Sequence, residues 1–179
     1  MRKEPPGGNN PTYSKRRNMW ATGGVITQID VPGADGTWVT AIARDSTLIG
    51  YYLETVNGKQ KVYGFVRGPN SNFFRFRVPL GFKVYPQGIN NEAGVIVGSY
   101  GEGSNGIVKI HGFVYNYLAD LAALDGVSAN AVRTVSIQTV DYPGNHDTYV
   151  TGVNAKGVLV GYAVQGVRPI FSFIATPLP

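Results

Sequence analysis

GINNEAGVIVGSY, residues 88–100, is the stretch that decides the fold, because the chain carries it three times. AIARDSTLIGYY at residues 41–52 and GVNAKGVLVGYA at residues 152–163 follow the same order, with one extra residue in the middle copy. In each copy a short polar link joins one apolar, strand-like run to the next. Asn and Gly tolerate the positive φ that tight turns need, so the stretch predicts a β-hairpin in three places.

The same Gly- and Asn-rich loop has two chemical interpretations, a phosphate cradle and a calcium loop. A phosphate cradle needs a helix directly after the loop, whereas residues 95–100 have the pattern of a strand. A calcium loop needs carboxylates at alternate positions, and Glu92 is the single one here. The loop therefore predicts a turn rather than a ligand site.

The similarity between the three copies extends to both sides of the hairpin. A lead segment precedes it, ITQIDVPG at residues 26–33 and IQTVDYPG at residues 137–144, with FFRFRVP at residues 73–79 as a weaker copy. An aromatic strand closes each copy, and these strands are YGFV from residue 63, HGFV from residue 111 and FSFI from residue 171. Such repetition predicts one supersecondary unit used three times within a single domain, 25–179. We place the units at about 25–72, 73–136 and 137–179.

Composition agrees with many short strands joined by tight turns. The 179 residues suit one domain, and they include 24 Gly, 11 Pro, 11 Tyr and 8 Phe. Charged residues make up 15% of the chain, below the roughly 25% of an average soluble domain. The absence of Cys excludes disulfides, Cys-ligated zinc and thiol nucleophiles. No apolar run approaches the roughly 18 residues that span a bilayer.

Residues 1–24 are predicted to form a basic, extended arm. They hold five basic side chains against one acidic one, a net charge of +4, whereas the rest of the chain has a net charge of +1. The arm lacks the apolar core of roughly 7 to 15 residues that a secretory signal has, and its prolines and glycines disfavour a helix. It is either a solvated tail or an anchor on an anionic surface. The anchor hypothesis assigns partner binding to Arg2, Lys3, Tyr13, Lys15, Arg16, Arg17 and Trp20.

The order strand, xDxPG, ΦNxxGxΦVGxY and HGFΦ resembles the repeats of the bacterial extracellular HAF family, over residues 26–179. The first unit departs from this pattern with Ala43 in place of the turn Asn and Tyr63 in place of His111. The third has Phe171 and Ser172 where the pattern has His-Gly. The resemblance implies a propeller-like β structure and an extracellular or periplasmic location, and it implies no general activity.

We therefore expect an all-β fold of three repeated four-stranded units with one short helical insertion. Three blades are fewer than the usual four to eight of a propeller, so either the units close around a pseudo-threefold axis or two chains share a six-bladed ring. We favour the closed monomer over the homo-dimer. In it the first strand, 25–30, pairs with the last, 170–175, and hides both sheet edges.

The helical insertion is expected at about 116–133, where the second unit is longer than the others. Tyr117, Leu121 and Leu124 lie at helical spacing, Asn116 can cap the helix and Asp125-Gly126 can stop it. This apolar stripe either covers one end of the β body or binds a partner protein. The second alternative adds Tyr117, Leu121 and Leu124 to the partner-binding residues.

The sequence predicts no catalytic residue, no metal ligand and no cofactor. His111 lies in a strand and is expected to be hydrogen-bonded, and His146 lies in a turn beside Asp147, which alone makes no tetrahedral metal site. Asp30 and Asp141 precede Pro-Gly at matching places, which favours turn hydrogen bonds over an acid/base pair. GxSxG, HExxH and P-loop motifs are absent. We expect a protein that is not an enzyme.

The sequence thus predicts a non-catalytic interaction or structural subunit, docked through its basic arm and its loops onto a larger protein assembly, for which a membrane-associated assembly is one candidate. The alternative is a carbohydrate-binding module, suggested by the aromatic residues Trp38, Tyr51, Tyr52, Tyr100 and Tyr162. A hydrolase-like enzyme is third. Specific nucleic-acid binding is not expected, because an arm alone gives only salt-sensitive attraction that is independent of nucleic-acid sequence.

Overall fold

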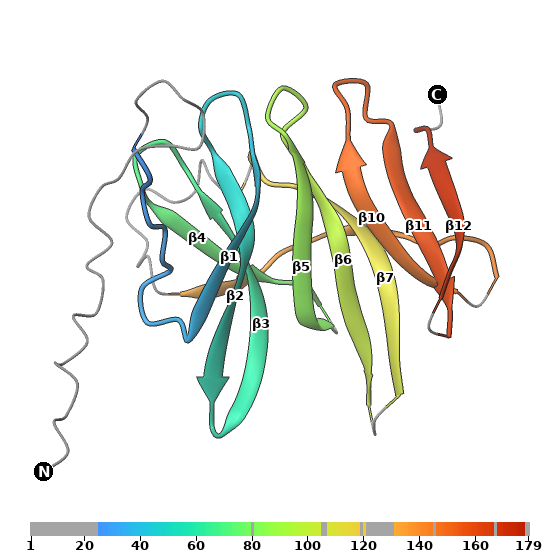
Figure 1. Cartoon of the computed structure of the whole chain (residues 1–179), viewed down its shortest axis with the longest axis horizontal. Helices are drawn as coiled ribbons and strands as arrows, with labels where there is room; N and C mark the ends of the chain where they lie inside the picture. Colours follow the sequence, from blue (N-terminus) through green and yellow to red (C-terminus); the bar gives the residue numbers. More distant parts are fainter. Residues whose placement is uncertain are drawn as a thin grey trace, which may run out of the picture.

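The computed structural model describes residues 25–79, 81–104, 107–118, 120, 131–144, 146–166 and 168–177. These residues build an all-β fold, as predicted (Figure 1). The strands are β1 (Gly36–Ile42), β2 (Leu48–Val56), β3 (Lys59–Arg67), β4 (Phe73–Arg77), β5 (Gly81–Asn90), β6 (Val95–Ser104), β7 (Ile107–Asn116), β8 (Val132–Thr134), β9 (Gln138–Val140), β10 (Asp147–Val153), β11 (Leu159–Gln165) and β12 (Arg168–Ala175).

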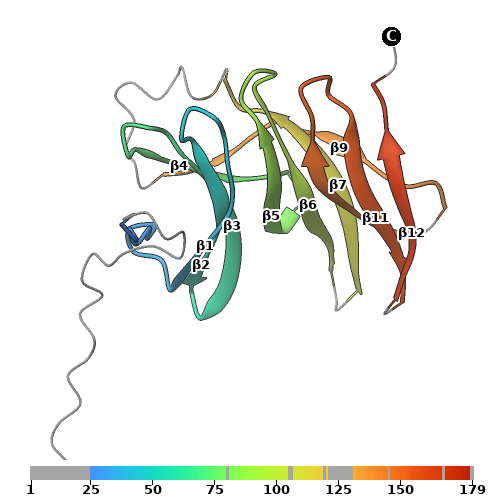
Figure 2. The same cartoon turned by 45° about the horizontal axis from the view of Figure 1, so that its top comes forward.

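Three antiparallel meanders, β1-β2-β3, β5-β6-β7 and β10-β11-β12, correspond to the three sequence units. Figures 1 and 2 show them side by side in one row. A parallel bridge between β3 and β5 merges the first two meanders, together with β4, β8 and β9, into a nine-stranded mixed sheet. The third meander forms a separate three-stranded sheet, and neither sheet closes on itself.

The predicted closed monomer is therefore wrong. Val25 makes only an isolated bridge, residues 26–31 carry no strand, and β12 pairs only with β11 among the described residues. The two segments that were expected to pair lie at opposite ends of the row (Figure 1). Because these two segments are so far apart in one chain, they do not pair, and the sheets stay open.

Each later lead segment completes the unit before it. β4, from the lead segment of the second unit, pairs with β3, and β9, from the lead segment of the third, pairs with β7. The register is the same in both cases, because the residue three places before the lead proline lies opposite the second residue of the aromatic strand. The pairs are Phe76 opposite Gly64 and Val140 opposite Gly112.

A β-bulge recurs eight residues after each lead proline, at Thr40, Gln87 and Thr151. The glycine of the ΦVGxY pattern, on the second strand of each unit, lies across from the first strand next to this bulge. A Cβ on Gly98 would lie 2.2 Å from the carbonyl oxygen of Tyr85, and Gly50 and Gly161 meet a carbonyl oxygen in the same way. These glycines are therefore required by the close approach of two backbones.

The three short polar links are hairpin turns, as predicted. The Oδ1 of Asn90 accepts hydrogen bonds from the N–H groups of Glu92 and Ala93, and the Oδ1 of Asn154 accepts from those of Lys156 and Val158. In the first unit, which has Ala43 instead of Asn, the carboxylate of Asp45 accepts from the N–H of Thr47. The turn chemistry is thus kept while the residue that supplies it changes.

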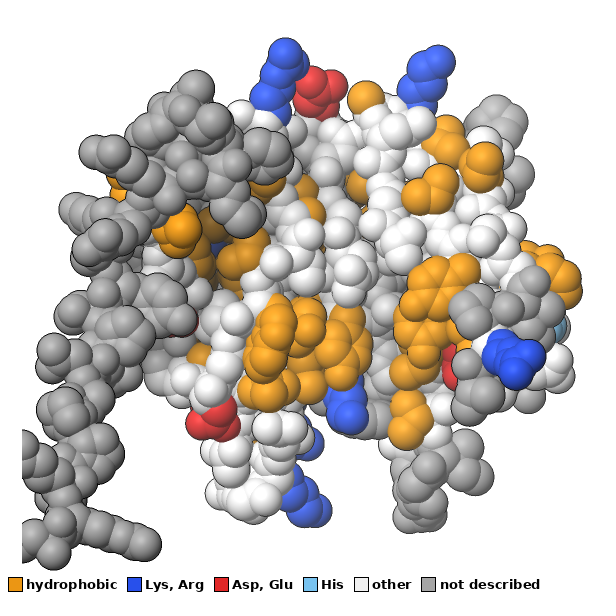
Figure 3. Space-filling model, viewed as in Figure 1, with side chains coloured by type: hydrophobic (Ala, Val, Ile, Leu, Met, Phe, Trp, Pro, Cys, Tyr) orange, Lys and Arg blue, Asp and Glu red, His pale blue; other side chains and the backbone are white. Residues whose placement is uncertain are grey.

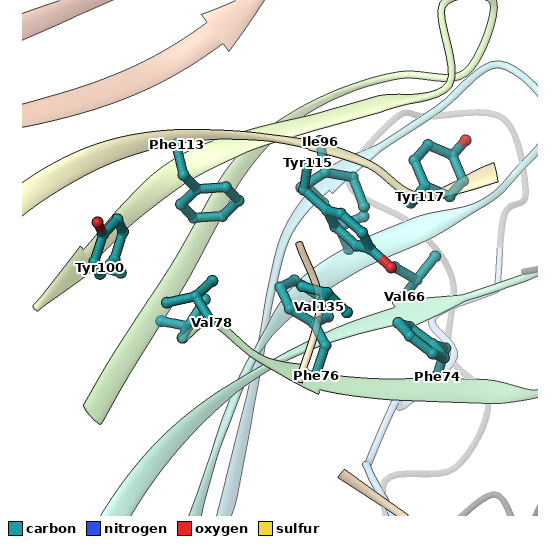
Figure 4. Close-up of a cluster of buried hydrophobic side chains, with 12 residues drawn as sticks. Val66, Phe74, Phe76, Val78, Ile96, Tyr100, Phe113, Tyr115, Tyr117 and Val135 are labelled. Carbon is teal, nitrogen blue, oxygen red and sulfur yellow. The ribbon is translucent and has the colours of Figure 1, made fainter. Parts of the chain in front are cut away.

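The core lies mainly between the first and second units (Figure 4). Phe74 and Phe76 of β4 point toward Phe113 and Tyr115 of β7, and the rings of Phe76 and Tyr115 are 5.1 Å apart. The cluster between the second and third units is smaller and centres on Val97, Val150 and Leu159. The units are therefore held together face to face.

The predicted helical insertion lies largely outside the described residues, which skip 119 and 121–130. Leu118 and Asp120, near the start of the predicted range, have helical backbone, whereas the bounds of the insertion differ from the prediction. Asn116, the expected cap, is the last residue of β7, and Val132–Thr134 forms β8 parallel to β4. Among the described residues no helix is long and apolar enough to cross a membrane.

Candidate functional site

The first strands of the three units carry an aromatic residue at one equivalent position, six residues after each lead proline. These residues are Trp38 on β1, Tyr85 on β5 and Tyr149 on β10. Tyr51 on β2 and Tyr162 on β11 lie directly across from Trp38 and Tyr149. We call these five residues the aromatic surface.

The rings of the aromatic surface contact one another across strands and across units. Trp38 stacks on Tyr51 with centroids 5.2 Å apart, and Tyr149 stacks on Tyr162 at 4.8 Å, both within 9° of parallel. Tyr51 in turn meets Tyr85 of the next unit edge-on at 5.1 Å. Figure 3 shows hydrophobic side chains gathered over β1, β2 and β5 and again over β10 and β11. An apolar strip of this kind on a solvent face marks a binding surface.

Partial burial raises the pKa of two phenol groups of this surface. Burial raises the pKa of Tyr85, and the neighbouring Tyr51 raises it further. Burial also raises the pKa of Tyr149, with Asp147, Tyr162 and Tyr85 adding to the effect. Tyr85 and Tyr149 therefore offer apolar ring atoms and uncharged hydroxyl groups, which suit a ligand with apolar groups and hydrogen-bonding partners.

The structure separates the aromatic residues that suggested carbohydrate binding. Trp38, Tyr51 and Tyr162 belong to the aromatic surface, whereas Tyr52 and Tyr100 are buried in the core. Aromatic character alone did not single out Tyr85 and Tyr149. Their constant spacing of six residues from the lead proline is the sequence signal that identifies them. Neighbouring residues of a strand point to opposite faces, which explains why Tyr51 is on the surface and Tyr52 is not.

His111 forms the most developed polar cluster of the described residues. Its Nδ1 lies 2.9 Å from Oδ1 of Asp141 and its Nε2 lies 3.7 Å from Oε2 of Glu102. Its ring also stacks on Tyr100 at 5.2 Å. Both ring nitrogens thus face carboxylates, which orients the imidazole and ties β7 to the start of the third unit.

The other titratable residues singled out in the sequence have local partners. Asp141 bonds His111 rather than its own turn, and Asp30 accepts a hydrogen bond from Nε2 of Gln28. His146 packs edge-on against Tyr142 and Phe171. Among the described residues no group of His, Asp or Glu side chains is placed to hold a metal ion.

A groove of about 680 Å³ runs between the second and third units. Its lining is mostly apolar and includes Val95, Val114, Val140, Val153 and Leu159. It borders the smaller core cluster and carries one carboxylate, that of Asp141. The groove therefore adds apolar surface and no further chemistry.

The predicted partner-binding residues lie mostly outside the part of the chain that the structure describes. This applies to Arg2, Lys3, Tyr13, Lys15, Arg16, Arg17 and Trp20 in the arm and to Leu121 and Leu124 in the insertion. Tyr117 is described, and its side chain is 1% exposed within the larger core cluster. Because Tyr117 covers the β body, it is not available to a partner.

No family model, curated protein or solved structure matches this chain. The resemblance to HAF repeats accordingly stays a prediction that rests on the repeated residues themselves.

Proposed function

We propose that this protein is a non-catalytic interaction subunit, a rigid β scaffold that binds a partner protein through its aromatic surface. The observation that carries the proposal is the row of rings shared by the first strands of all three units. Aromatic residues are enriched at protein interfaces, where they contribute large contact areas. The His111 cluster, by contrast, is engaged in holding β7 to the start of the third unit.

The geometry of the rings favours a protein partner over a sugar. Trp38 and Tyr51 cover one ring face of each other, and so do Tyr149 and Tyr162. Tyr51 also receives the edge of Tyr85. A sugar that stacks on an aromatic residue needs a free ring face, whereas protein side chains also pack against ring edges.

The wider setting of the proposal follows from the repeats and the arm. The three units form an open row of meanders, and the resemblance to HAF repeats supports an extracellular or periplasmic setting for the proposed subunit. The basic arm, residues 1–24, attaches the scaffold to an anionic face of the assembly or of a membrane. Five basic side chains at about 1 kcal/mol each suffice for reversible attachment.

Replacing Tyr85 with Ala is expected to reduce recovery of the partner assembly at least tenfold, because an interface anchor is lost. Tyr142→Ala is the matched control, since Tyr142 is also half-buried and stacked, against Phe171 at 5.3 Å, but lies outside the aromatic surface. A chain that starts at Gly23 should also recover less of the assembly. Quantitative co-purification followed by mass spectrometry measures all three. Equal recovery by the Tyr85 and Tyr142 variants contradicts the proposal.

A carbohydrate-binding module is the second candidate. The observation in its favour is that Trp38, Tyr85 and Tyr149 occupy one equivalent position in the three units, as repeated sugar sites require. A glycan array distinguishes the two functions. If the full chain binds defined sugars and Tyr85→Ala abolishes this binding, the result supports the lectin and contradicts the interaction subunit.

A further inference from the structure

At both ends of the row, apolar residues are exposed whose equivalents in the other units are buried between units. At the end formed by the third unit, Val160 is 44% exposed, whereas its equivalents Ile49 and Val97 are 0% exposed. On the same face Ile174 is 73% exposed, whereas its equivalent Val66 is 0% exposed. The third unit thus presents a face built for packing against a following unit.

The end formed by the first unit shows the complementary feature. Val39 is 44% exposed, whereas its equivalents Pro86 and Val150 are buried, and Val150 packs with Val97 of the preceding unit. Ile42 is 65% exposed, whereas its equivalents Ile89 and Val153 pack on the clusters between units. The first unit thus presents a face built for packing against a preceding unit.

The backbone is incomplete at the same two ends. β3 and β7 are each covered by a lead strand, but β12 pairs only with β11 among the described residues. The lead segment of the first unit, 26–30, has the sequence of a lead strand and forms no strand. An open edge and an unused strand at opposite ends of one chain are complementary.

The register of this missing pairing follows from the two that are present. Phe76 lies opposite Gly64 and Val140 lies opposite Gly112, each three residues before the lead proline. The same rule places Ile29 opposite Ser172. It also places Gln28 opposite Phe173 and Thr27 opposite Ile174.

We propose that a second copy of this chain completes the third unit, with its segment 26–30 paired to β12 and its first unit packed on the exposed face of the third. The exchange is reciprocal in a twofold dimer, so both open ends are covered at once. Two copies supply six units, within the usual range of roughly four to eight for a closed propeller, whereas one copy or three fall outside it. This proposal is independent of the proposed function.

The aromatic surface gains continuity in such a ring. Tyr51 of the first unit meets Tyr85 of the second edge-on. In the equivalent contact across the dimer, Tyr162 of one copy meets Trp38 of the other. Across each dimer contact, the rings of Tyr149 and Tyr162 in one copy then continue into the rings of Trp38, Tyr51 and Tyr85 in the other.

An engineered disulfide tests the register directly, because the chain contains no Cys of its own. In the full chain, Thr27→Cys together with Ile174→Cys places two exposed positions opposite each other across the dimer. Mild oxidation should convert more than half of the protein to a covalent dimer on a non-reducing gel. Gln28→Cys with Ile174→Cys is the matched control, since a shift of one residue turns the thiol to the other face.

The unmodified full chain should sediment with twice the 19.3 kDa mass of a single chain. A monomer at micromolar concentration, or an open series of trimers and larger species, overturns the proposal. A dimer that cross-links equally well in the control register overturns it too. A dimer cross-linked only through positions 27 and 174 supports it.

Discussion

Replacing Gly98 with Ala is expected to lower the free energy of unfolding by about 3 kcal/mol, because the new methyl group has no room. It would lie 2.2 Å from the carbonyl oxygen of Tyr85 and 2.8 Å from Cα of Pro86. Both neighbours are backbone atoms of β5, so the strands must separate at the bulge to admit it. The bulge is the feature that all three units share, which makes this substitution a test of the repeat itself.

The measurement is thermal unfolding followed by circular dichroism, with an expected decrease in Tm of about 6 to 12 °C. Gly68→Ala is the control, since a Cβ there meets no atom within 4 Å. We expect its effect to stay within about 0.5 kcal/mol. Equal stability of the Gly98 and Gly68 variants contradicts the close approach at the bulge.

Replacing Phe76 with Ala is expected to lower the free energy of unfolding by about 4 kcal/mol. Phe76 is fully buried, lies over Gly64 of β3 and packs against Phe74 and Tyr115. It belongs to β4, the lead strand of the second unit that completes the first. The loss therefore measures how much a lead strand contributes when it joins two units.

Urea unfolding monitored by fluorescence reports this change as a lower midpoint with a similar slope. Phe171→Ala is the matched control, because Phe171 is 43% exposed on β12 and is stacked on Tyr142. We expect it to lose less than half as much stability as Phe76→Ala. Comparable losses in the two variants contradict the central position assigned to β4.

The hairpins and the threefold repeat were predictable because their causes are local. Turn residues such as Asn90 and Asn154 bond to backbone groups a few residues away, so their type and spacing are readable without the fold. In the first unit Ala43 stands in place of the turn Asn, and Asp45 of the same loop supplies the turn hydrogen bond instead. Local causes of this kind repeat wherever the sequence repeats.

The closure of the sheet was not predictable, because strand pairing depends on what lies alongside. Segments 26–30 and 137–141 have nearly the same sequence. Only the second contributes a strand, β9, which pairs with β7. The first has no such neighbour in its own chain. A strand's pattern describes its fit to a sheet and does not show that the sheet is there.

The aromatic surface was predictable in part. Trp38, Tyr51 and Tyr162 were recognised as candidates, while Tyr52 and Tyr100 were assigned to the same group and are core residues. Which of two adjacent aromatic residues faces solvent depends on the packing of whole units, which a repeat pattern alone does not provide. Equivalent positions in the three units, rather than aromatic character, identify the surface.

Photo-crosslinking from the aromatic surface tests the central claim most directly. The full chain, with benzoylphenylalanine in place of Tyr85, is irradiated in the cells that produce it, beside a control with the same group in place of Tyr142. We predict one discrete adduct, formed only from position 85, in which the second component is a protein of different sequence. No protein adduct from position 85, or the same adducts from positions 85 and 142, would contradict an interaction subunit that works through this surface.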